Sequence, residues 1–113
     1  MEVKSAEIVE IRNSTVDSEV TKIVLQFNNG FNIFKLRITK KNLNYDDLLS
    51  CDELLTGFAV KVVFYARNCC KNSPTVLLNS ENQGDRKEIV DIINKCLEIK
   101  GEDIRAAINK MVM

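Results

Sequence analysis

The Asn29-Gly30 pair lies between two alternating apolar runs and constrains the fold of this chain more than any other feature. Both central residues of the tightest hairpin turns take positive φ, a conformation that glycine and asparagine adopt most easily. The pair therefore predicts a β-hairpin with Asn29 and Gly30 as a two-residue loop. Its two strands are expected at residues 19–27 and 31–39.

A two-residue loop determines which side chains share a face of the hairpin. In this register Leu25 lies opposite Phe34, and Ile23 lies opposite Leu36. Together with Ile38, these apolar residues form the face that we expect to join the core.

The other face of the predicted hairpin is polar and basic. Here Lys22 is expected directly opposite Arg37, and Val24 opposite Lys35. Two cations placed side by side are mildly destabilising. Two interpretations remain open: an ordinary solvated face on which the long side chains splay apart, or a face covered by an anion or an acidic partner.

Three further strands are expected outside the hairpin. Residues 3–11 alternate imperfectly, which indicates a first strand at an edge of the sheet. Residues 58–67 alternate most regularly, and residues 75–78 form a short strand. Polar and glycine-containing segments separate these runs, as expected for loops.

Helical signals occur in the middle and at the end of the chain. Residues 43–56 carry capping residues and predict a short helical insertion. Asp85 and Glu88 have capping-box spacing and precede apolar residues at helical intervals, and Gly101 is expected to end this helix. A second helix is expected from Glu102 onward. Its apolar face carries Ile104, Ala107, Ile108 and Met111.

Strands that come first and helices that come last indicate an α+β fold. We expect an antiparallel sheet of about five strands, with the short helical insertion and two C-terminal helices packed on one face. The length of 113 residues suits one domain with one core, over residues 1–113.

The composition argues against an enzyme. The chain has no His, which removes the commonest general base and the commonest metal ligand. Cys51, Cys69, Cys70 and Cys96 form no Cys-x-x-Cys motif, so we expect free thiols, with Cys96 in the core. We therefore expect no catalytic residues, no cofactor and no metal site.

The charges are balanced, with 16 basic and 16 acidic residues, but the basic ones gather along the predicted strands. If the Phe58 side of its strand faces the core, six candidate binding residues share the outward sheet face. These are Lys22, Lys35, Arg37, Lys61, Tyr65 and Arg67. Such a face suits a nucleotide, single-stranded nucleic acid or an acidic protein surface, and an ordinary solvated face remains the alternative.

The first hypothesis is a small non-enzymatic binding or inhibitor protein that acts through protein–protein contacts as a homo-oligomer, joined by its apolar C-terminal helix. Abundant Asn, Lys and Ile suggest an AT-rich genome, and hence a phage or mobile-element gene. The alternative is a binder of a nucleotide-type ligand or nucleic acid through the basic sheet face. No apolar run approaches a membrane span and no signal peptide is evident, so we expect a cytoplasmic protein without membrane contact.

Overall fold

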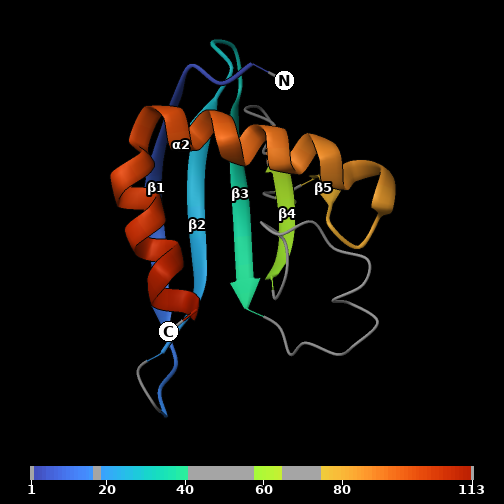
Figure 1. Ribbon diagram of the computed structural model, residues 1–113. Coiled ribbons are helices and arrows are strands. Elements are labelled where there is room, and N and C mark those ends of the chain that lie inside the picture. The colour runs from blue at the N-terminus through green and yellow to red at the C-terminus, as the bar shows by residue number, and fades with distance from the viewer. Residues whose placement is uncertain (1, 17–18, 41–57, 65–74, 113) are drawn as a thin grey trace, which may run out of the picture.

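The computed structural model describes residues 2–16, 19–40, 58–64 and 75–112 (Figure 1). Five strands form one antiparallel sheet in the order β1-β2-β3-β4-β5, so each strand pairs with its neighbours in the sequence. A helix, α2, follows the last strand and covers one face of the sheet. The elements span Ser5–Asn13 (β1), Val20–Asn28 (β2), Ile33–Lys40 (β3), Phe58–Phe64 (β4), Thr75–Asn79 (β5) and Gln83–Val112 (α2).

The predicted α+β class and the five-stranded antiparallel sheet are confirmed. β1 is an edge strand, as its imperfect alternation indicated. The short helical insertion predicted at 43–56 lies outside the described residues, and so does the predicted end of the fourth strand at residues 65–67.

The prediction of two C-terminal helices is wrong, because a single helix runs from Gln83 to Val112 with a kink at Lys100. Lys100 has φ −133° and ψ 44°, a non-helical conformation that interrupts the regular helix. Gly101 therefore does not end the helix, which continues at an angle. Figure 1 shows the first limb crossing the strands and the second limb running down beside β1.

The start of α2 also differs from the capping box expected at Asp85. The side-chain oxygen of Asn82 accepts a hydrogen bond from the Gly84 N–H at 3.0 Å, so Asn82 caps the helix. The Asp85 carboxylate instead accepts a bond from the backbone N–H of Asn79 at 3.1 Å. Arg86 Nε donates to the Ser80 carbonyl at 2.6 Å. Both charged side chains thus tie the helix to the end of β5.

The β2–β3 hairpin forms where it was predicted, but its loop has four residues instead of two. Asn28 pairs with Ile33, which leaves residues 29–32 as the loop. Gly30 has the expected positive φ, 95°. Leu25 now lies opposite Leu36, and the whole register is shifted by two residues from the prediction. An even shift leaves every side chain on its predicted face.

Side chains of the loop explain its extra length. The Asn29 side-chain oxygen accepts hydrogen bonds from the backbone N–H groups of Phe31 at 3.0 Å and Asn32 at 2.8 Å. The Asn28 side-chain oxygen accepts one from the Gly30 N–H at 3.1 Å. These bonds satisfy backbone donors that a four-residue loop would otherwise leave unpaired.

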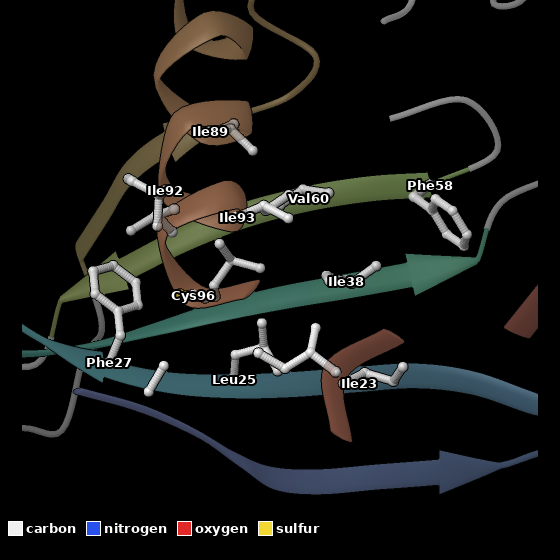
Figure 2. Packing of buried hydrophobic residues seen from close by; sticks show 14 of the residues in the cluster. Ile23, Leu25, Phe27, Ile38, Phe58, Val60, Ile89, Ile92, Ile93 and Cys96 are labelled. Atoms are coloured by element: carbon white, nitrogen blue, oxygen red, sulfur yellow. The ribbon is translucent and has the colours of Figure 1, made fainter. Parts of the chain in front are cut away.

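The core lies between α2 and one face of the sheet (Figure 2). The aromatic rings of Phe27 and Phe34 stack across the β2–β3 pair with centroids 5.3 Å apart, and Phe34 also contacts Phe64. Each fully buried aliphatic or aromatic side chain stabilises the fold by roughly 1.5–3 kcal/mol. The residues labelled in Figure 2 are Ile23, Leu25, Phe27, Ile38, Phe58, Val60, Ile89, Ile92, Ile93 and Cys96.

Candidate binding face of the sheet

The face of the sheet that points away from α2 carries a cluster of cations at its centre. Arg37 on β3 lies directly opposite Lys61 on β4 and opposite Val24 on β2. Lys35 precedes Arg37 by two residues and therefore shares this face. The four predicted cations described by the structure, Lys22, Lys35, Arg37 and Lys61, are called the basic face below.

The remaining two candidate residues, Tyr65 and Arg67, lie outside the described residues. The predicted opposition of Lys22 and Arg37 is wrong, because the four-residue loop shifts the register. Lys22 instead pairs with Thr39 on β3. The cation that lies across from Arg37 is Lys61, a pairing that the hairpin alone did not predict.

Lys22 lies beside an acidic residue of the neighbouring strand β1. Its Nζ lies 3.9 Å from the Glu10 carboxylate of β1, and Glu10 also forms an ion pair with Arg12 at 3.3 Å. The Lys22 side chain is only 23% exposed. The acidic group on β1 therefore offsets part of the charge of Lys22.

Arg37 and Lys61 lie directly opposite each other on neighbouring strands. Directly opposite residues of an antiparallel pair have Cβ atoms about 4.5–5.5 Å apart, and like charges at this distance destabilise a sheet. Lys61 is exposed, whereas Lys35 and Arg37 are half-buried. A carboxylate or phosphate can accept charge-assisted hydrogen bonds from an Arg and a Lys together.

Two buried valines lie beneath these cations, and sequence reasoning did not identify them. Val24 and Val63 point to the outer face, yet they are only 3% and 0% exposed. Val24 lies between Glu10 and Arg37, while Val63 lies beside Lys35. Lys and Arg stems can cover apolar surface while their charges stay in water. Val24 and Val63 are thus shielded from solvent within the chain itself.

Within residues 2–16, 19–40, 58–64 and 75–112, no three Cys, Asp or Glu side chains gather as metal ligands would. Burial raises the pKa of the Cys96 thiol to about 11, so this thiol stays protonated at neutral pH. The other three cysteines lie outside the described residues.

No helix in the described part of the chain is long and apolar enough to cross a membrane. Comparisons with protein-family models, with curated proteins and with solved structures found no match. Functional inference therefore rests on the geometry of the basic face.

Proposed function

We propose that this chain is a small non-enzymatic binding protein of the inhibitor type that holds an acidic protein surface against its basic face. The observation that supports this function is the placement of Arg37 directly opposite Lys61, with Lys35 on the same face. The chain has no net charge overall, whereas Lys35, Arg37 and Lys61 gather on one face of the sheet. Segregated charge is typical of surfaces that steer and orient a partner.

The side chains that the described part of the basic face presents favour a protein partner. Val24 and Val63 are already buried in the free chain, so a partner would contact the cations and not the valines. Proteins that bind single-stranded nucleic acid add aromatic rings on which bases stack. The described strands present cations on this face and keep their phenylalanine rings on the core face, an arrangement better suited to carboxylates than to bases.

A nucleotide-type ligand or nucleic acid is the second candidate for the same face. It is favoured by the spacing of Arg37 and Lys61, since two neighbouring cations also suit a phosphate group. Binding of this kind would weaken steeply with added salt, because each phosphate contact releases counterions.

Self-association and a phage or mobile-element origin complete the proposal. Ile104 and Met111, on the apolar helix face that prompted the homo-oligomer hypothesis, are fully buried within the chain. Self-association through α2 would thus use exposed residues such as Ile99. Light scattering across micromolar concentrations tests it, and a monomer throughout would exclude it. The neighbouring genes test the proposed origin.

Binding to two defined polyanions tests the proposed function. We expect the chain to bind poly-L-glutamate at low salt, and expect combined Lys35→Glu, Arg37→Glu and Lys61→Glu substitutions to weaken binding roughly tenfold or more. A matched control reverses three exposed charges on α2: Lys87→Glu, Arg105→Glu and Lys110→Glu. Equal losses in the two variants, or no binding to poly-L-glutamate, would exclude the proposal. Binding to a dT oligonucleotide alone would support the second candidate instead.

A further inference from the structure

An apolar corner adjoins the basic face at the tip of the β2–β3 hairpin. Phe31 in the loop is 83% exposed, and Ile33 at the start of β3 is 44% exposed. Ile33, Lys35 and Arg37 alternate along β3 and so share the outer face. From its tip inward, the hairpin thus presents the apolar side chains of Phe31 and Ile33, followed by the cations Lys35 and Arg37.

Hydrogen bonds within the loop hold the backbone of Phe31 in place. Four hydrogen bonds lie within residues 28–32, including the two that Asn29 accepts from Phe31 and Asn32. The backbone N–H of Lys4 also donates to the Asn28 carbonyl at 2.8 Å, which ties the N-terminal segment to the hairpin. A preorganised loop loses little conformational entropy on binding. Large aromatic side chains are also the commonest anchors of protein interfaces.

We infer that Phe31 and Ile33 anchor this chain in an apolar pocket of an acidic partner protein, with Lys35, Arg37 and Lys61 facing carboxylates beside that pocket. This inference rests on the proposed function and adds the shape and polarity of the partner's surface. A second copy of the chain is disfavoured as the occupant. Two-fold pairing through this corner would bring the cations of one copy close to the same cations of the other.

Photo-crosslinking in the cells that express the chain tests this inference. Phe31→p-benzoylphenylalanine places the reactive group at the anchor, and Val16→p-benzoylphenylalanine places it at a control position that is 92% exposed. We expect one adduct with a different protein from position 31 and none from position 16. The crosslinked peptide should lie beside acidic residues, and the adduct should be lost when Lys35 and Arg37 are both changed to Glu.

Affinity for the purified crosslinked protein provides the quantitative test. We expect Phe31→Ala to weaken binding about 30-fold, as loss of an interface hot spot does, and Val16→Ala to change it less than twofold. The melting temperature of Phe31→Ala should equal that of the parent chain, because the side chain is exposed. An adduct with a second copy, equal adducts from both positions, or no adduct would overturn the inference.

The two levels of proposal fail in different ways. If charge reversal at Lys35 and Arg37 weakens binding but Phe31→Ala does not, the proposed function of the basic face is supported and the inferred role of Phe31 is wrong. If Phe31→Ala weakens binding and charge reversal does not, the inference that the partner surface is acidic is wrong, and the proposed function is wrong too.

Discussion

Gly30 has a φ of 95°. A residue with a Cβ atom is strained in this conformation, and the strain lowers the stability of the folded state. We expect Gly30→Val to destabilise the chain by about 1–3 kcal/mol. A Cβ at this position would lie 3.7 Å from Lys4 Cγ, an ordinary contact, so the cost is conformational and not steric. Thermal unfolding measures the change, and an unaltered melting temperature would contradict the positive φ.

Gly84 provides the matched control for this substitution. It lies in the first turn of α2, where a Cβ would have only the Asn82 side-chain oxygen at 3.4 Å as a close neighbour. Ala is favoured over Gly in a helix by about 0.5–1 kcal/mol. We therefore expect Gly84→Ala to leave the stability unchanged or to raise it slightly.

The Cys96 thiol should make the stability of the folded chain depend on pH in the alkaline range. Burial raises the pKa of its thiol from 9.0 to about 11, so the folded state favours the protonated form. The stabilisation from this shift is fully present below pH 9 and is lost as the pH rises through 11. A shift of this size corresponds to about 2–3 kcal/mol.

The comparison with Cys96→Ala isolates this contribution from other groups that titrate in the same range. We expect urea unfolding to show the parent chain more stable than the variant at pH 8. The difference between them should shrink steadily toward pH 11. A constant difference would mean that the thiol is not buried as described.

At the scale of elements, the second limb of α2 makes its own contribution to the core. Ile104 follows the kink and is 0% exposed, whereas Ile99 precedes the kink and is 40% exposed. We expect Ile104→Ala to cost about 2–5 kcal/mol by leaving a cavity. Ile99→Ala should change the stability by roughly 0.5 kcal/mol or less. Equal effects in urea unfolding would mean that the second limb does not pack on the sheet.

The strands and their faces were predictable because the alternation of apolar residues does not depend on the register between the strands. Asn29 and Gly30 correctly marked the turn, but the loop length depends on hydrogen bonds that the Asn28 and Asn29 side chains make, which the pair itself does not encode. Since the resulting shift is even, Lys35 and Arg37 remained on the outer face. Their position was therefore predictable, although their pairing was not.

The kink of α2 and the buried outer valines were not predictable for a different reason. Gly101 looks like a helix end in sequence, yet packing on the sheet keeps the chain helical on both sides of Lys100. Val63 sits at an outward position, and alternation assigns such positions to solvent. Both features depend on what lies against the element, which a local pattern does not contain.

At the scale of the whole molecule, charge distribution matters more than net charge. Acidic groups on β1, such as Glu10, lie beside Lys22, while the cations of β3 and β4 lie opposite each other. Placing Arg37 against Lys61 costs sheet stability, by roughly 0.2–1 kcal/mol for a cross-strand pair. Under the proposed function, this pair would serve binding at a small cost in stability.

Lys61→Glu separates stability from binding at this pair. The change converts a repulsive cross-strand pair into an attractive one, so we expect a small gain in stability of up to about 1 kcal/mol. The same change removes a cation from the centre of the basic face, so binding to poly-L-glutamate should weaken. Lys61→Gln should give an intermediate result in both measurements. If Lys61→Glu instead lowers the melting temperature, then Lys61 has a structural role. If the variant still binds poly-L-glutamate as tightly as the parent chain, then the partner does not contact this part of the sheet.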